Sequence, residues 1–450
     1  MARAKKETAL TPEERLQAAL VPDWEWPYKL PENWCWTRHN SIMDIVGGAQ
    51  PEKAFFIRES KEGYVQLYQT RDYGENPVPV YIPQKYATKT TDEGDILLAR
   101  YGGSLGKVFR AHKGAYNVAL AKVIILYPEV VDDEFLYLYY YSHFYQDFCI
   151  KAGYGRSAQA GFNKSDLNEL LFPLPPFIEQ QRIVDRIESL FAKLDEAKEK
   201  AQAVVDSFET RKAAILHKAF TGELTAKWRK EHGVGMESWE VRTLDSVCSS
   251  IFDGDHMPPP KAESGIPFLV ISNVNTGHLT FENTRFVPQE YYDTLSDTRK
   301  PQLGDVLYTL VGSFGIPAVV NSKRPFCFQR HMALLRPIDV SPQFLWYILQ
   351  TPEMYDKASS IATGTAQLTV PIKGLRAMTI PRPNIAEQVE IVRILDGFFA
   401  REQSAKEAAE AVLDQINLMK KSILARAFRG ELGTNDPSEE SAVELLKQII

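Results

Sequence analysis

The stretch "ARYGGSLGKVFRAH" at residues 99–112 contains residue types that could bind a nucleotide phosphate. In a loop of the form G-x-x-x-x-G-K-[ST], backbone N–H groups and the Lys hold the phosphates, and the hydroxyl holds Mg²⁺. Gly106 and Lys107 fit this pattern, but Tyr101 replaces the first Gly and Val108 replaces the Ser or Thr. The stretch therefore does not predict an NTPase. A glycine turn between two strands explains it better.

Metal and disulfide chemistry are also poorly represented in the sequence. The cysteines lie far apart and form no CxxC pair, which argues against a zinc site or a disulfide framework and fits a reducing compartment. They are Cys35, Cys149, Cys248 and Cys327. We predict no metal site and no catalytic residue in this chain. The first 20 residues lack the apolar core of a signal peptide, and no apolar run approaches a membrane span, so we expect a cytoplasmic protein.

The segments that must position any functional residues occur as an internal sequence repeat. "FPLPPFIEQQRIV" at 172–184 recurs as "IPRPNIAEQVEIV" at 380–392, and "AILHKAFTGEL" at 214–224 recurs as "SILARAFRGEL" at 422–432. Both pairs have an offset of 208 residues. Upstream of these elements, "GDILLARYGGSLG" in the first half corresponds to "GDVLYTLVGSFG" in the second half. Ile316 stands at the position of Lys107, so the two halves do not share a phosphate-binding lysine. A chain of 450 residues is too long for one core, and the duplication indicates two similar halves.

The closely matched parts of the repeat predict two long helices, at 177–221 and 384–429. Apolar residues follow alternating spacings of four and three, which is typical of a coiled-coil seam. Arg211 interrupts the first stripe and Glu402 interrupts the second. Asn384 and Glu387 are placed to cap the second helix, and Pro176 precedes the first. Gly222 and Gly430 are placed to end the first and second helix. The stripes are Ile183, Ile187, Leu190, Leu194, Ala197, Ala201, Val204, Phe208 and Ile215, and Ile391, Leu395, Phe398, Ala405, Ala409, Val412, Ile416, Met419 and Ile423.

The diverged parts, 31–176 and 236–383, read as mixed α/β domains. Short apolar runs bounded by Gly, Pro, Asn and Asp predict strands and turns, whereas 133–153 and 341–364 read as aromatic-rich helices. Residues 1–30 form an N-terminal extension, 222–235 a linker and 430–450 an acidic C-terminal tail. The predicted fold is α+β: two similar mixed α/β domains joined by two long antiparallel coiled-coil helices, with an internal pseudo-two-fold.

This architecture suits the reading of two half-sites on one DNA duplex. A helix of about 40 residues is roughly 60 Å long, and one duplex turn is about 34–36 Å. Antiparallel pairing would therefore separate the two globular domains by between one and two turns. Because their sequences differ, the two half-sites should differ as well.

The paired "PLPPFIEQQRIV" and "PRPNIAEQVEIV" elements, with "AFTGEL" and "AFRGEL", resemble the DNA-specificity subunit of type I restriction–modification systems. The resemblance covers residues 21–450. It implies two target-recognition domains and two helices that bind two methyltransferase (modification) subunits and, through them, restriction/translocase subunits. It also implies that S-adenosylmethionine, ATP and Mg²⁺ belong to those partners and that this chain holds no cofactor. The sequence has neither a [DNS]-P-P-[FYW] nor an F-x-G-x-G motif, in agreement with a non-catalytic subunit.

Candidate DNA contacts are polar residues in or beside turns that follow the predicted strands. Arg and Lys suit guanine, Asn and Gln suit adenine, and hydroxyls or basic groups hold phosphates. In the first domain the candidates are Gln69, Thr70, Arg71, Arg100, Ser104, Lys107 and Arg156. In the second domain they are Ser272, Asn273, Asn275, Ser313, Arg330, His331 and Gln367. For any one of them, a turn-capping or solvated role is at least as good an explanation.

Net charge does not decide between function classes. The chain carries −6, but residues 384–450 hold 8 basic and 12 acidic side chains and so account for −4 of it. The two globular segments are nearly balanced, so a local basic face remains compatible with the composition. A stand-alone DNA-binding repressor or architectural protein is the alternative. It explains two reading domains but gives the matched helices no purpose.

Overall fold

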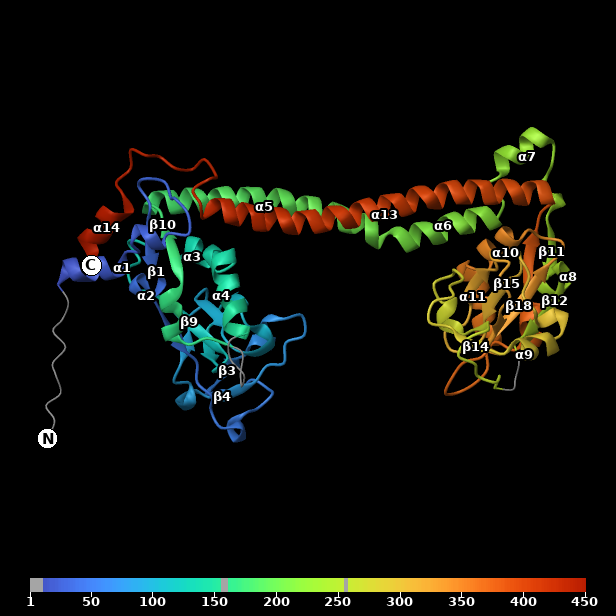
Figure 1. The fold of residues 1–450 in the computed structure, drawn as a ribbon, viewed down its shortest axis with the longest axis horizontal. Coiled ribbons are helices and arrows are strands. Elements are labelled where there is room, and N and C mark those ends of the chain that lie inside the picture. The colour runs from blue at the N-terminus through green and yellow to red at the C-terminus, as the bar shows by residue number, and fades with distance from the viewer. Residues whose placement is uncertain (1–10, 155–160, 255–257) are drawn as a thin grey trace. The chain divides into compact units, whose positions relative to one another are not determined.

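The computed structural model describes residues 11–154, 161–254 and 258–450. The chain divides into two compact units, one formed by residues 1–200 with 412–450 and the other by residues 201–411. Each unit contains one globular domain and its own stretch of paired helix (Figure 1). No helix in the described part of the chain is long and apolar enough to cross a membrane.

The first unit has a four-stranded sheet of order β2-β9-β6-β7, a second of order β4-β3-β8-β5, and the pair β1-β10. Its strands are β1 Cys35–Arg38, β2 Met43–Gly47, β3 Tyr64–Tyr68, β4 Tyr81–Pro83, β5 Thr90–Thr91, β6 Ile96–Ala99, β7 Val108–Arg110, β8 Gly114–Tyr116, β9 Leu120–Ile125 and β10 Leu171–Leu174. Its helices are α1 Pro12–Ala19, α2 His39–Ile42, α3 Asp133–Tyr139, α4 His143–Tyr154, most of α5 Phe177–Asp206, the end of α13 Ile385–Ala427, and α14 Ala442–Ile449.

The second unit has a four-stranded sheet of order β12-β18-β15-β16, a three-stranded sheet of order β14-β13-β17, and the pair β11-β19. Its strands are β11 Glu240–Thr243, β12 Cys248–Asp253, β13 Ile266–Leu269, β14 Arg285–Val287, β15 Val306–Thr309, β16 Pro317–Val319, β17 Cys327–Phe328, β18 Met332–Pro337 and β19 Thr379–Arg382. Its complete helices are α6 Phe208–Phe220, α7 Ala226–His232, α8 Leu244–Val247, α9 Gln289–Thr294, α10 Pro342–Ile348, α11 Pro352–Ile361 and α12 Ile372–Ala377.

The two domains share one topology despite their different sequences. The sheet β2-β9-β6-β7 matches β12-β18-β15-β16 strand for strand, and both are antiparallel throughout. In the other sheet, β3 pairs antiparallel with β4 and parallel with β8, as β13 does with β14 and β17. The duplication seen in the sequence is therefore a duplication of fold, and the predicted fold class is confirmed.

The glycine-rich stretch is the turn between β6 and β7. Gly102 and Gly106 have φ of +68° and +85°, a region that suits glycine because it has no Cβ. Gly312 and Gly315, between β15 and β16, have φ of +71° and +90°. A shared turn geometry thus explains the shared glycines, as the sequence predicts.

Both predicted aromatic-rich helices are broken near their middle. The stretch 133–153 forms α3 and α4, and the stretch 341–364 forms α10 and α11. In the second domain, Thr351 starts a new helix because its hydroxyl accepts a hydrogen bond from the Met354 N–H at 3.2 Å and Pro352 occupies the first turn. Several aromatics of these two stretches are core residues: Phe135, Tyr139, Tyr140 and Phe344 are fully buried, whereas Tyr141 and Tyr355 are exposed.

The long helices start and end where the sequence places them. The Glu387 N–H donates to the Asn384 side chain at 2.9 Å, so Asn384 caps α13. Gly222 and Gly430 follow the helix ends with φ of +84° and +73°. The predicted first helix is not continuous, however, because Ser207 separates α5 from α6.

Within the second unit α6 runs antiparallel to the first part of α13 (Figure 1). Lys406 lies over the Phe208 ring at 5.0 Å, and farther along α6 Arg211 contacts Glu402, so partners on α13 move backward as α6 advances. Not all of the predicted stripe on α13 lies in the seam: Ala405, Val412 and Met419 are exposed. A straight helix drifts by about 20° per heptad from a 3.5-residue repeat, which carries some stripe positions out of the seam.

Candidate DNA-reading surfaces

In the first domain, two of the predicted contacts line one hollow. Gln69, Thr70 and Arg71 lie at the 3₁₀ turn Thr70–Tyr73 directly after β3, and Asp72 fixes this turn by accepting the Gln69 N–H at 2.8 Å. Gln69 and Arg71 line a hollow of about 650 Å³. Its other lining residues are Gln50, Pro51, Lys53, Phe56, Arg58 and Val80. The hollow combines three cationic side chains with two amides, the groups that bind phosphates and base edges.

The other candidates of this domain are separate from that hollow. The Arg100 guanidinium lies over the Tyr101 ring at 4.7 Å and donates through Nε to the Val118 carbonyl oxygen at 3.1 Å. Ser104 is half-buried in the 3₁₀ turn Gly102–Ser104. Lys107 is exposed and lines a different hollow, which includes Lys420 and Lys421 of α13. Arg156 lies outside the described residues.

In the second domain, three predicted contacts meet in one place. Arg330, His331 and Gln367 line a hollow of about 420 Å³ together with Asp253 at the end of β12. Ser313 is exposed on the adjacent turn, where the Gly312 N–H donates to the Leu368 carbonyl at 3.0 Å. The turns after β15, before β18 and before α12 therefore present their polar residues together.

His331 titrates differently from an exposed histidine. Burial lowers the pKa of the His331 imidazole, and the neighbouring positive charge of Arg330 lowers it further. At neutral pH the ring is therefore uncharged and carries one donor and one acceptor, while Arg330 carries the positive charge of the hollow.

The remaining candidates lie at the 3₁₀ turn Ile271–Asn273 after β13. Ser272 and Asn275 are exposed. Asn273 is buried and is not available for DNA: its Oδ1 accepts the Val270 N–H at 3.0 Å and its Nδ2 donates to the Glu282 carbonyl at 3.0 Å. This asparagine shapes the turn, because Asn side chains readily bond to nearby backbone groups.

The sequence reasoning missed some residues of both hollows. Gln50, Lys53 and Arg58 come from the long connection between β2 and β3, and Asp253 ends a strand. None of them lies in a turn that follows a predicted strand, and the 50–58 connection has no strand pattern of its own. A count of basic and amide residues over 48–60 was the available signal.

Each domain is fixed to its long helix by a buried Glu-Gln pair of the repeat. In the first domain, Gln180 accepts the Asp132 N–H at 2.8 Å and donates to the Val130 carbonyl at 2.7 Å. In the second domain, Gln388 accepts the Ser341 N–H at 2.9 Å and donates to the Pro383 carbonyl at 2.9 Å. The repeated E-Q motif is therefore structural and holds each globular domain on its long helix.

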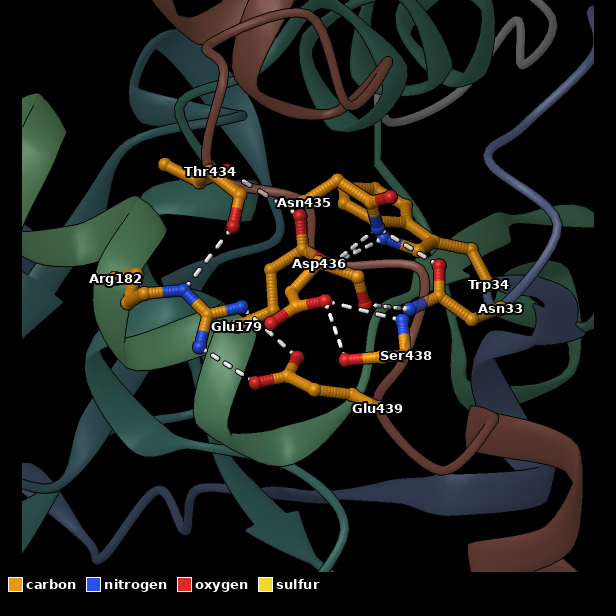
Figure 2. A network of polar contacts seen from close by, with 9 residues as sticks. All are labelled: Asn33, Trp34, Glu179, Arg182, Thr434, Asn435, Asp436, Ser438 and Glu439. Atoms are coloured by element: carbon orange, nitrogen blue, oxygen red, sulfur yellow. Dashed lines mark hydrogen bonds and ion pairs between the residues drawn. The ribbon is translucent and has the colours of Figure 1, made fainter.

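The first junction, drawn in Figure 2, is closed by residues from the C-terminal end of the chain. The Glu179 carboxylate accepts hydrogen bonds from Trp34 Nε1 at 2.7 Å and Asn435 Nδ2 at 2.8 Å. Arg182 forms a two-pronged ion pair with Glu439 at 2.7 and 2.8 Å. Burial raises the pKa of the Glu179 carboxyl, and the hydrogen bonds oppose that rise.

The second junction repeats this arrangement with the linker in place of the C-terminus. The Glu387 carboxylate accepts hydrogen bonds from Trp239 Nε1 at 2.9 Å and the Thr225 hydroxyl at 2.7 Å. Arg229 forms a buried ion pair with Glu387 at 2.6 Å. The two junctions thus share a glutamate and a tryptophan. A cation, Arg229, contacts the carboxylate in the second junction, whereas neutral donors contact it in the first.

Comparisons with known proteins agree with this duplicated design. The profile described as "Type I restriction modification DNA specificity domain" matches residues 31–205 and 236–413. The specificity subunit of the type I restriction enzyme EcoKI from Escherichia coli K12 is 26% identical, covering 94% of this chain and 96% of that protein. The MjaVIII specificity subunit from Methanocaldococcus jannaschii is 25% identical over 90% of this chain and 94% of its own length.

Solved structures show the same fold. A chain from a study of complex assembly and conformational transition in a type I R-M system has a TM-score of 0.69 at 22% identity, covering 90% of this chain and all of that one. The HsdS subunit from Thermoanaerobacter tengcongensis has a TM-score of 0.60 at 21% identity, covering 90% of this chain and 99% of its own. The alternative of a stand-alone repressor or architectural protein finds no support in these matches. With both halves matched and the curated relatives covered almost end to end, this chain belongs to the family of type I restriction–modification DNA-specificity subunits.

Proposed function

We propose that this chain binds double-stranded DNA in the cytoplasm at a bipartite, asymmetric site, with one globular domain reading each half. The observation that carries the proposal is that the two globular domains share one backbone arrangement but have different side chains at equivalent positions. The Arg100 N–H donates to the Ala119 carbonyl, and the Leu310 N–H donates to the His331 carbonyl in the same place of the other domain. The chemistry offered to DNA therefore differs between the halves, while the scaffold does not.

Domain exchange tests this proposal directly. Residues 31–170 would be replaced by the corresponding domain of a relative, and methylated sites would be mapped in cells that also carry the partner subunits. We expect one half-site to change and the other half and the gap to stay constant. A simultaneous change in both halves would contradict independent reading.

We further propose that the catalysis belongs to partners: methyltransferase subunits that methylate adenine and restriction/translocase subunits that cleave DNA. These partners would supply the sites for S-adenosylmethionine, ATP and Mg²⁺. The support is that the glycine-rich stretch serves as a strand turn and lacks two fixed residues of a nucleotide loop. ATP hydrolysis or DNA methylation by the purified chain, lost in Lys107→Ala, would contradict this part of the proposal.

The long helices offer a matched surface on which two identical partner subunits can dock. Several residues are the same in both repeats although their side chains are exposed, so the helix seam does not explain the match. Their spacings of seven, four and three place them on one side of each helix. They are Ala192, Glu199, Ala203 and Asp206 on α5, and Ala400, Glu407, Ala411 and Asp414 on α13.

Charge reversal on this matched surface tests the docking proposal. Glu199→Arg and Glu407→Arg should each remove one of two methyltransferase subunits from the purified complex, and the double variant should remove both. Glu196→Arg is the control, because Glu196 is also exposed but its repeat counterpart is Ser404. Mass measurement of the intact complexes gives the stoichiometry. Retention of two partner subunits by the double variant would contradict docking on this side of the helices.

A further inference from the structure

The two polar interruptions of the apolar stripes face each other. Arg211 Nε donates to Glu402 Oε2 at 2.7 Å, in the second unit. The exposed fractions of the two side chains are 34% and 19%, so the pair lies at the partly desolvated edge of the seam. Two residues that look like separate defects of two stripes form a single contact.

Arg211 also joins the two helices on either side of the break at Ser207. Its Nη2 donates to the Val204 carbonyl of α5 at 3.2 Å, and its Nη1 contacts the Ser207 hydroxyl. One guanidinium thus contacts the last turn of α5, the residue between the helices, and Glu402 of α13. Ser207 alone separates α5 from α6, and its N–H still donates to the Ala203 carbonyl at 3.1 Å. Arg211 therefore acts at the point where this helix is locally interrupted.

The second junction does not hold this point either. Glu402 is fifteen residues beyond Glu387 on α13, which is about 22 Å at 1.5 Å per residue. The neighbouring contacts are apolar or small: Ala201 and Ala409 are buried, and Phe208 lies under Lys406. Apolar contacts of this kind tolerate a shift by one heptad, whereas a charged pair in a seam specifies one alignment.

A shift of one heptad would separate the charges. If α5 and α6 slid by seven residues along α13, Lys406 would lie over residue 201 instead of Phe208. Arg211 would then face Leu395 and Glu402 would face Val204, so both charges would lose their partner in the seam. The repeat counterparts of Arg211 and Glu402 are Met419 and Leu194, which carry no charge. In the first unit the residues that follow them, Lys420 of α13 and Asp195 of α5, form an ion pair at 2.5 Å.

We propose that the Arg211–Glu402 pair is a positioning element that fixes the alignment of the helices at the α5–α6 break, within the second unit. Its consequence for DNA rests on the proposed function. A misalignment of the helices by seven residues is a displacement of about 10 Å, or about three base pairs at 3.4 Å each. The pair would therefore set which gap between half-sites the complex accepts. Neither residue touches DNA in this role.

Cysteine crosslinking tests the alignment without DNA or partners. Phe208→Cys with Lys406→Cys reports the observed alignment, and Ala201→Cys with Lys406→Cys reports a shift of one heptad. The native cysteines are all buried and do not compete. Ala201 is also buried, so labelling of the single Ala201→Cys variant with a monofunctional maleimide first establishes that this reporter reacts. Each cysteine pair would be placed in three backgrounds: the natural chain, the double-leucine variant Arg211→Leu with Glu402→Leu, and the charge-swapped variant Arg211→Glu with Glu402→Arg. Each protein would then be treated with a short bis-maleimide.

We expect the natural and charge-swapped backgrounds to crosslink 208 with 406 only, and the double-leucine background to yield at least a tenth as much of the 201–406 product. The double-leucine chain should keep its melting temperature, because an apolar seam can replace an ion pair without loss. The matched control is Glu196→Leu with Lys200→Leu, which removes an exposed ion pair within α5. Exclusive 208–406 crosslinking in the double-leucine background would overturn the proposal.

A library of sites with gaps varied by up to three base pairs then tests the DNA consequence. We expect the double-leucine complex to methylate more than one gap and the charge swap to restore the natural gap. Broadened crosslinking with an unchanged gap would show that the pair aligns the helices without setting the gap. A natural complex that methylates no bipartite site contradicts the proposed function and leaves the crosslinking result standing.

Discussion

The two junction glutamates, Glu179 and Glu387, are both buried, but different kinds of group contact their carboxylates. Glu387 is paired with the Arg229 guanidinium, and both side chains are almost fully buried. Among the described residues, the donors in contact with the Glu179 carboxylate are neutral and come from Trp34, Thr434 and Asn435. The cation of the first junction, Arg182, instead pairs with Glu439 at the surface. Removing the arginine should therefore have unequal consequences in the two halves.

Arg229→Ala should destabilise the second unit by about 3–5 kcal/mol, because it leaves the Glu387 charge buried and unpaired. Arg182→Ala should cost less than about 1 kcal/mol, since its pair with Glu439 is partly exposed and screened. Denaturant unfolding followed by tryptophan fluorescence measures both. Equal losses in the two variants would show that the buried pair has no special weight.

His39 makes the first unit sensitive to acid. The imidazole is buried against Tyr140, and burial lowers its pKa to about 4. The unfolded chain binds this proton near pH 6.5, so the neutral ring contributes stability above that pH. The contribution is lost as the pH falls from 6.5 toward 4.

Between pH 7 and pH 5 this histidine should therefore cost the first unit about 2 kcal/mol. His39→Gln, which can still bond to Tyr140, should lose less stability over the same range. The comparison of the two pH profiles isolates His39 from the carboxylates, which titrate in both proteins. Parallel profiles would show that His39 is not the cause.

At the scale of elements, fewer residues are buried between the long helices than the apolar stripes in the sequence predict. Leu395 is fully buried, whereas Met419 is half exposed although both belong to the predicted stripe. We expect Leu395→Ala to destabilise the second unit by about 2–5 kcal/mol and Met419→Ala to change stability by less than about 0.5 kcal/mol. Thermal unfolding of the two variants checks this. A large loss in Met419→Ala would place it in the seam after all.

Sequence reasoning succeeded where one local rule decides the outcome. Asn384 caps α13 and Gly222 ends α6, because capping chemistry depends on neighbouring residues alone. It failed where a tertiary contact decides: Asn273 reads as an exposed turn amide, but the turn folds back and buries it. The division of 133–153 into two helices was likewise missed, because an unbroken aromatic run shows no stop signal.

The candidate DNA contacts were only partly predictable for the same reason. Arg330, His331 and Gln367 are brought together from two turns that lie 36 residues apart in sequence, an arrangement that only the shared topology reveals. Lys53 and Arg58 join Arg71 from a connection without any periodic pattern. Spacing rules describe residues on one helix or strand and carry no information on which loops meet.

Over the whole chain, the termini of the first unit take the place that the linker holds in the second. Thr225 and Arg229 follow α6 and close the second junction, while Thr434 and Asn435 follow α13 and close the first. The segment expected to be an acidic tail is thus part of the fold, and α14 packs against α1. The first junction is held by noncovalent contacts where the second has a continuous chain.

This difference predicts selective loss of the first junction when residues 434–450 are deleted. The deletion removes two donors to Glu179, the Glu439 partner of Arg182, and the buried Ala442 and Leu446 of α14. The exposed Glu179 region should then exchange its amide hydrogens at least tenfold faster, while the Glu387 region keeps its protection because its partners Thr225, Arg229 and Trp239 are untouched. Hydrogen exchange with mass spectrometry resolves the two regions, and a synthetic peptide of residues 434–450 should restore protection to the first alone. If both regions lose protection together, the junctions are coupled, and the chain end has a wider role than closing the first domain.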